Sequence, residues 1–231
     1  MSGAVLAIEA TTSMGSLALR RPDGSILERP LPPSREHAAQ LMPAIAALLE
    51  AAEVQGESLA AIVCATGPGS FTGVRIALAT AHGLSLGWSG IPLFAATTTL
   101  TLAAGAQVEA GEGVVPLIDA RKKEFYCSRI RGGVEVDLTH EPATLWWNEI
   151  LPAWAAEGSL VLIGDALDLP GTPSDLPAGV RLAPPETRHP QARHLLTLHA
   201  QGRTVGPLSP VQLQPTYVRP PDAIPPKPIA G

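Results

Sequence analysis

The chain has 231 residues, of which 45% are hydrophobic and 16% are charged, so it can bury a substantial core and is not disordered as a whole. Aromatic residues make up only 4%, which predicts a mainly aliphatic core. The formal net charge of −5 provides no overall basic surface for nucleic acid, so any contact with RNA is expected to run through a partner. Cys64 and Cys127 lie in apolar runs and are expected to be reduced and buried.

After an initial hairpin, the first half of the chain alternates strand and helix signals. The predicted elements are strands at 4–10, 59–65 and 91–96, a hairpin at 15–30 and helices at 34–53 and 70–88. Ser34 is the expected N-cap of the first helix. The apolar face of that helix is expected to consist of Leu41, Met42, Ile45, Leu48 and Leu49. The opening residues lack a basic flank, which argues against a signal peptide or a membrane span and favours a cytoplasmic protein.

The second half begins like the first, at an offset of about 110 residues. The segments that match in pairs are 4–10 with 114–120 and 16–21 with 126–131. Both copies end their first strand with a carboxylate, Glu9 in one and Asp119 in the other. The pattern predicts an internal duplication, although one hairpin can resemble another by chance.

This arrangement resembles the superfamily of actin, the sugar kinases and Hsp70, in which an RNase H-like fold is duplicated. The resemblance implies an α/β protein with two small lobes, each a mixed sheet flanked by helices. The expected division is an N-terminal lobe at 1–104, a C-terminal lobe at 105–214 and a Pro-rich tail at 215–231 that is extended or disordered after Arg219.

In that superfamily the two acidic strand ends face a nucleotide and its metal across the cleft. The resemblance therefore implies candidates for a vestigial nucleotide site, which are Glu9, Thr11, Thr12 and Asp119. The alternative is that both carboxylates are ordinary solvated turn residues or caps for the next segment.

Several segments together resemble the TsaB family, also called YeaZ. They are 6–19, 34–45, 116–126, 215–219 and above all 67–87, which contains Gly67-Pro68-Gly69-Ser70-Phe71-Thr72-Gly73-Val74-Arg75. The resemblance implies a non-catalytic scaffold in the bacterial synthesis of threonylcarbamoyladenosine on tRNA. The implied partners are the catalytic transferase TsaD and the ATPase TsaE, with tRNA contacted only indirectly. A homodimer stays open for the chain alone.

The glycine-rich segment before the second helix fits no phosphate-binding pattern. A Walker A loop has lysine and a hydroxyl residue after its last glycine, whereas Val74 and Arg75 follow Gly73 here. The dinucleotide pattern needs a third glycine where Thr72 stands, and Pro68 removes one N–H donor. The segment is therefore predicted to launch a docking helix rather than to hold a phosphate.

The second helix is apolar or small around most of its circumference, so it must be covered on more than one side. The sheet and the first helix can cover two sides, and the remaining side fits a partner helix unless the helix is buried within its own lobe. The family resemblance implies that both helices bundle with the equivalent pair of the transferase. The predicted interface residues are His37, Leu41, Ile45, Ser70, Phe71, Val74, Arg75, Thr80 and Gly83.

Catalysis by the chain alone is not expected. The transferase relatives hold a metal with a His-x-x-x-His pair in the region that corresponds to 97–105, where this chain has no histidine. His189, His194 and His199 are spaced five apart, so they cannot share a helical face and are interpreted as solvated positions. No metal or cofactor is expected on the isolated protein, while a nucleotide at the interface of the complex stays open.

Two enzymatic alternatives also stay open. One is an ATP-dependent kinase or carbamoyl transferase, for which only Ile163-Gly164-Asp165 hints at a late glycine-rich adenosine segment. The other is an M22-type peptidase. The basic run at 121–123 is interpreted as a solvated turn, with contact to tRNA or a nucleotide as the alternative.

Overall fold

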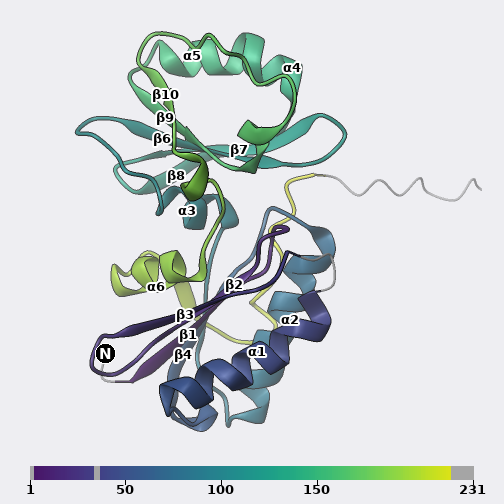
Figure 1. The fold of residues 1–231 in the computed structure, drawn as a ribbon, viewed down its shortest axis with the longest axis vertical. Coiled ribbons are helices and arrows are strands. Elements are labelled where there is room, and N and C mark those ends of the chain that lie inside the picture. The colour runs from purple at the N-terminus through teal and green to yellow at the C-terminus, as the bar shows by residue number, and fades with distance from the viewer. Residues whose placement is uncertain (1–2, 34–36, 220–231) are drawn as a thin grey trace, which may run out of the picture.

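The computed structural model describes residues 3–33 and 37–219, with the side chains of 37 and 38 excepted. Two lobes are stacked along the long axis of the molecule, each built on a mixed sheet (Figure 1). The first sheet contains β1 (Ala4–Glu9), β2 (Ser16–Arg20), β3 (Ile26–Pro30), β4 (Leu59–Ala65), β5 (Leu93–Ala96) and β11 (Val205–Leu208). The second contains β6 (Gly113–Asp119), β7 (Glu124–Arg131), β8 (Val134–Pro142), β9 (Leu160–Ile163) and β10 (Val180–Leu182).

Helices cover both faces of the first sheet, and in the second α3 lies on one face while α4 and α5 lie over the other (Figure 1). They are α1 (His37–Ala52), α2 (Phe71–Gly87), α3 (Thr98–Ala103), α4 (Ala143–Leu145), α5 (Leu151–Ala155) and α6 (Ala192–Ala200). Shorter helical turns lie at Gly56–Ser58, Trp146–Ile150, Asp165–Asp168 and Pro185–Thr187. The predicted strands, hairpin and helices of the first half are confirmed within a few residues at each end, and Ser34 lies outside the described residues. None of the helices in the described ranges is long and apolar enough to cross a membrane.

The strand order confirms the predicted duplication. In the first sheet the order is β11-β5-β4-β1-β2-β3, and in the second it is β10-β9-β6-β7-β8, so five strands of the first correspond to the five of the second. In each copy the first strand pairs antiparallel with the second and parallel with the fourth. The fold class predicted from the sequence, two small lobes with mixed sheets flanked by helices, is therefore confirmed.

The lobes do not follow the chain order that the domain prediction assumed. Helix α6 packs on β1, β2 and β4 of the first sheet, and β11 pairs antiparallel with β5 at its edge. Conversely, α3 packs on β6 of the second sheet. The predicted unit 105–214 is thus wrong at its end, because its last helix and strand complete the first lobe. Residues 220–231 of the predicted tail lie outside the described part of the chain.

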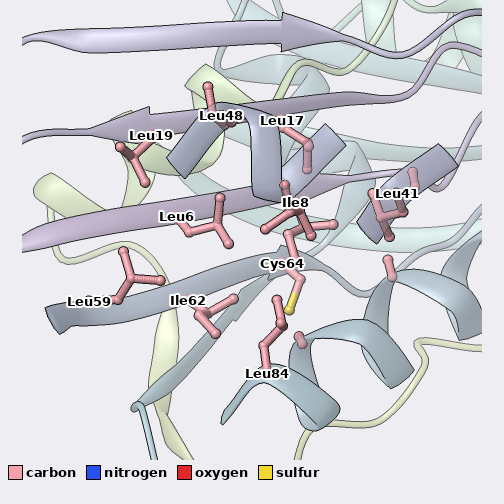
Figure 2. Close-up of a cluster of buried hydrophobic side chains, with 14 of the residues drawn as sticks. Leu6, Ile8, Leu17, Leu19, Leu41, Leu48, Leu59, Ile62, Cys64 and Leu84 are labelled. Carbon is pink, nitrogen blue, oxygen red and sulfur yellow. The ribbon is translucent and has the colours of Figure 1, made fainter. Parts of the chain in front are cut away.

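The first lobe has the aliphatic core that the composition predicted. Alternate residues of β1 point to opposite faces of the sheet, as the two-residue period of a strand requires. Leu6 and Ile8 meet α1 and α2 (Figure 2), whereas Val5 and Ala7 meet α6. Buried cysteine Cys64 lies in the same layer, unpaired as expected, and Cys127 is buried and unpaired in the second lobe.

The core of the second lobe is also mainly aliphatic, as predicted, but it contains an aromatic cluster that the composition did not indicate. Trp146 is fully buried and packs edge-on against Phe125, Trp147 and Trp154. Three of the four tryptophans of the chain therefore lie in one cluster. The low overall aromatic content hid this concentration.

The apolar face predicted for α1 is confirmed except at one position. Leu41, Ile45, Leu48 and Leu49 are buried against the sheet, but Met42 is 49% exposed. One residue on an α-helix corresponds to a rotation of about 100°, so Met42 turns away from the face that Leu41 occupies.

Candidate functional site

A cleft with a cavity of about 850 Å³ lies between the two lobes. The β1–β2 turn and the segment that leads into α2 form its first wall, and the end of β6 with the following turn forms the opposite wall. Thr216 to Arg219, near the end of the described chain, form a third. The cleft thus collects residues from three distant parts of the sequence.

Glu9 does not face this cleft, although it ends β1. Its carboxylate is fully buried and accepts hydrogen bonds from the backbone N–H of Thr11 at 2.7 Å and from the Thr11 hydroxyl. The Thr98 hydroxyl donates to that of Thr11 at 2.8 Å, so α3 closes the network. Burial raises the pKa of Glu9 from its usual 4.5 to about 7. Glu9 is therefore neither a residue of the cleft nor a solvated turn residue, whereas the alternative of a cap for the next segment agrees with its hydrogen bond from the Thr11 N–H.

Asp119, the equivalent residue of the second copy, does line the cleft, together with Thr11 and Thr12. Its carboxylate accepts from the backbone N–H of Arg121 at 2.8 Å and pairs with the Arg121 guanidinium at 2.9 Å. Its own backbone N–H donates to Asp165 at 3.0 Å. The structure therefore brings together three of the four predicted residues.

Asp165 is a residue of the cleft that the sequence indicated only faintly. It follows β9, the parallel neighbour of β6, and parallel strands end at the same edge of a sheet. Burial raises the pKa of its carboxyl group. The signal that could have located it is its position directly after the second parallel strand of its copy.

The turn after Asp119 holds three basic residues in an uncommon backbone conformation. Arg121, Lys122 and Lys123 have φ values of 65°, 54° and 61°, all in the left-handed region. For residues other than glycine this conformation costs roughly 1–2 kcal/mol each. All three residues are exposed, in agreement with the interpretation as a solvated turn, and two of them, Arg121 and Lys122, also line the cleft.

The glycine-rich segment before α2 packs closely on the β1–β2 turn. A side chain at Gly69 would collide with the carbonyl oxygen of Thr11, and one at Gly73 would collide with that of Ala10. The backbone N–H of Ser70 already donates to the Thr11 carbonyl at 2.7 Å, and the Ser70 hydroxyl caps α2 by accepting from Gly73. The glycines are explained by this close approach.

An exposed aromatic cluster lies at the mouth of the cleft. The Arg75 guanidinium stacks on the Phe71 ring at 3.8 Å and donates to the Tyr217 hydroxyl at 3.0 Å. The two rings are stacked with centroids 5.9 Å apart, and Phe71 and Tyr217 are 58% and 56% exposed. Thr216 fixes the second ring by bonding Thr66 through both backbone and side chain.

The predicted interface residues divide into two groups. Leu41, Ile45 and Val74 are buried in the core of this chain, so they cannot form part of an exposed surface and the prediction is corrected for them. Ser70, Phe71, Arg75 and Gly83 are exposed, and Thr80 is half-buried. The side chain of His37 lies outside the described residues.

Helices α1 and α2 lie side by side on one face of the first sheet (Figure 1). Each turns a stripe of small and apolar residues away from the sheet. The stripe of α1 consists of Ala39, Met42, Pro43 and Ala46, and that of α2 of Ile76, Ala79, Thr80, Gly83, Leu86 and Gly87. No charged residue lies within either stripe, and the nearest exposed charges on the same faces are Arg75, one turn before Ala79, and Glu50, one turn after Ala46.

The histidines of α6 belong to the core rather than to the solvated surface that was predicted. His194 and His199 are buried where α6 packs on the first sheet, and burial lowers the pKa of His194 to about 4. Within the described residues, no group of three or more histidine, cysteine, aspartate or glutamate side chains could hold a metal ion.

Two lobes with one strand order and a cleft between their strand ends define a duplicated protein of the actin-like ATPase fold. The family model for TsaD, tRNA N6-adenosine threonylcarbamoyltransferase, matches residues 29–144. The chain belongs to this family and, within it, to the TsaB (YeaZ) proteins.

The relatives support that assignment. The chain is 37% identical over 123 residues to the tRNA threonylcarbamoyladenosine biosynthesis protein TsaB of Bacillus subtilis, covering 53% of this chain and 52% of that protein. The Escherichia coli protein of the same name is 36% identical with the same coverage. The chain thus spans about half the length of the curated relatives it matches.

The likeness in three dimensions is more extensive. A crystal structure described as an uncharacterized protein with similarity to peptidase YEAZ from Pseudomonas aeruginosa has a TM-score of 0.75 at 28% identity, covering 94% of this chain and 100% of that chain. The YeaZ structure from the same organism has a TM-score of 0.72 at 27% identity, covering 93% and 99%.

Proposed function

We propose that this chain is a non-catalytic subunit in the biosynthesis of threonylcarbamoyladenosine on tRNA. In this proposal it binds the catalytic TsaD-type transferase through the outer stripes of α1 and α2, and the complex also includes a TsaE-type ATPase. The names of the curated relatives support the pathway. The same stripes can pair two copies of this chain when the transferase is absent.

The observation that carries the proposal is the absence of charge along two adjacent, exposed helical stripes within the described residues. Leu86 of α2 is 70% exposed and Met42 of α1 is 49% exposed. Most of the other residues of the two stripes are alanine or glycine. Small residues let helix backbones approach closely, and exposed apolar contacts gain free energy when a partner covers them. A bundle with two partner helices would bury both stripes.

The burial of Glu9 at the end of β1 supports a non-catalytic role. The Glu9 carboxylate is buried and bonded to Thr11, so it is unavailable to a metal-bound nucleotide in the cleft. The kinase, carbamoyl transferase and peptidase alternatives predict a stoichiometric metal or nucleotide site on the isolated chain. Calorimetry with zinc, iron and magnesium-ATP would reveal one, and steady ATP hydrolysis would favour the kinase alternative.

The docking proposal is tested with charges placed on the stripe. A Cβ atom added at Gly83 meets no atom outside its own helix backbone within 4 Å, and Gly83 is exposed, so Gly83→Arg is expected to fold. Arginine favours a helix over glycine by roughly 0.8–1.0 kcal/mol, so the isolated variant should be as stable as the wild type or more so. Thr80→Arg places a second charge on the same stripe. Both should abolish co-elution with the transferase, because an unpaired charge in a packed bundle must lose its water.

The matched control is Thr197→Arg. Thr197 is an exposed residue of α6, on the opposite face of the first sheet, so the same change should leave co-elution intact. In cells that depend on this copy, the two stripe variants should also remove threonylcarbamoyladenosine from tRNA. If Gly83→Arg and Thr80→Arg fold and still co-elute, the docking surface is elsewhere.

A further inference from the structure

The mouth of the interlobe cleft combines two features that the docking stripes do not use. One is the aromatic cluster of Phe71, Arg75 and Tyr217, in which Phe71 and Tyr217 are more than half exposed and the Arg75 guanidinium covers part of the Phe71 ring. The other is the left-handed basic turn, which presents Arg121 and Lys122 to the same cleft from the second lobe. A flat aromatic surface beside cations is the combination that binds unpaired nucleotides.

The side chains that line the cleft carry a small net positive charge, whereas the whole chain is negatively charged. The basic side chains that line it are Arg75, Arg121, Lys122 and Arg219, and the carboxylates are Asp119 and Asp165. Asp119 is paired with Arg121, and Arg219 is paired with Glu124 just outside the cleft. A chain with a net charge of −5 therefore gathers a small excess of cations at one place.

Rigid supports hold these groups in position. Tyr217 is fixed because Thr216 bonds Thr66 of the first lobe, and Arg219 donates to the Ala120 carbonyl of the second. Three consecutive left-handed residues are maintained in the turn, and strained backbone of this kind is concentrated at ligand-binding sites. The aromatic faces and the cations are thus preorganised on two walls of one cleft.

We infer that the mouth of the cleft contacts a single-stranded segment of RNA, with a base stacked on the Phe71–Tyr217 cluster and the backbone phosphates facing Arg121 and Lys122. The proposed function supplies the RNA, since it concerns a modified nucleotide of tRNA, but binding by the isolated chain does not depend on the transferase. Hydroxyl groups of Thr12 and Ser13 also line the cleft and can bond to ribose or phosphate.

The test uses the full-length chain and a short fluorescein-labelled oligoadenylate, with fluorescence anisotropy measured at low salt and at about 0.15 M salt. Salt-dependent binding is expected. Phe71→Ala should weaken it by about 5- to 150-fold, the range for loss of one stacked base. Lys122→Ala should lower the slope of log affinity against log salt by about 0.7, the value for one phosphate of a single strand.

Two controls match these changes. Lys123→Ala removes the same charge from the same turn, but Lys123 does not line the cleft, so affinity should stay at the wild-type value. Val134→Ala truncates an exposed apolar side chain at the far end of the second hairpin and should also have no effect. Circular dichroism of each variant checks the fold.

Several outcomes would overturn the inference. One is the absence of binding at low salt. Another is that Phe71→Ala and Lys122→Ala bind the oligoadenylate as tightly as their control variants do. A third is that free AMP or ATP displaces the RNA with comparable affinity, which would identify a mononucleotide as the ligand. Failure here is distinguishable from failure of the docking proposal, because Thr80→Arg should lose the transferase and keep the RNA. If Phe71→Ala loses only the transferase, the aromatic cluster is a protein contact.

Discussion

The two copies within this chain share a strand order but have diverged in what they do with it. At the end of β1, Glu9 is buried under α3 and bonded to Thr11, whereas at the end of β6, Asp119 faces the cleft and pairs with Arg121. The turn that follows is built of hydroxyl residues in the first copy and of basic residues in the second. In a duplicated fold, equivalence between the copies therefore predicts where a residue lies along the strand order, but not the environment or the interactions of its side chain.

The cores differ in the same way. Two long helices and aliphatic side chains cover the inner face of the first sheet, while that of the second is covered by aliphatic side chains together with a cluster of three tryptophans. The first copy can in turn expose a broad helical surface for a partner. The second copy has only short helices at the corresponding place and contributes instead to the cleft.

The largest effect is expected in the aromatic core of the second lobe. Trp146 is fully buried among three aromatic rings, and Trp146→Ala should lower the free energy of unfolding by about 3–5 kcal/mol. Denaturant unfolding of the isolated chain measures this. A loss below about 1 kcal/mol would mean that the cluster does not support the lobe.

A comparable loss is expected in the aliphatic core of the first lobe. Leu48 and Leu49 lie on the inner face of α1, and replacing either with alanine should cost about 2–5 kcal/mol and lower the melting temperature. Leu86→Ala is the control on the outer face of α2 and should stay within about 0.5 kcal/mol of the wild type. Equal effects at Leu48 and Leu86 would contradict the assigned orientation of the helices.

Glu9 should make stability depend on pH. Because its pKa is about 7 in the folded protein and 4.5 ordinarily, its contribution is complete below about pH 4.5 and is lost as the pH rises through 7. The neutral variant Glu9→Gln should gain on the order of 3 kcal/mol relative to the wild type between these limits. The difference between the two proteins is the quantity to measure, because His194, with its lowered pKa, opposes this trend. A difference that does not change with pH would contradict the assigned burial.

Asp119→Asn should have the smallest effect on stability. Its ion-pair partner, the Arg121 side chain, is 72% exposed, and such pairs contribute about 0–1 kcal/mol. Asparagine also keeps an oxygen that can accept from the backbone N–H of Arg121. Thermal unfolding of Asp119→Asn and Glu9→Gln, measured side by side, tests the comparison between the copies. If Asp119→Asn lowers the free energy of unfolding by more than about 2 kcal/mol, Asp119 affects stability as strongly as Glu9 does.

Local patterns in the sequence predict the strands and the inner face of α1, because each depends on periodicity within one segment, and the duplication is predicted by the match between segments about 110 residues apart. They do not predict that α6 and β11 return to the first lobe, since no local signal says which sheet covers an apolar helix. The same limit explains His194 and His199, interpreted as solvated but buried by the sheet that α6 reaches. The hydrogen-bond network of Glu9 is completed by Thr98, far along the chain, which donates to the Thr11 hydroxyl.

The most direct test of the account is hydrogen–deuterium exchange of the chain with and without the catalytic transferase. Added protection is predicted in α1 and α2, with α6 and the second lobe exchanging as in the isolated protein, and Gly83→Arg should abolish the difference. Protection of α6 or of the second sheet, with α1 and α2 unchanged, would contradict the docking proposal.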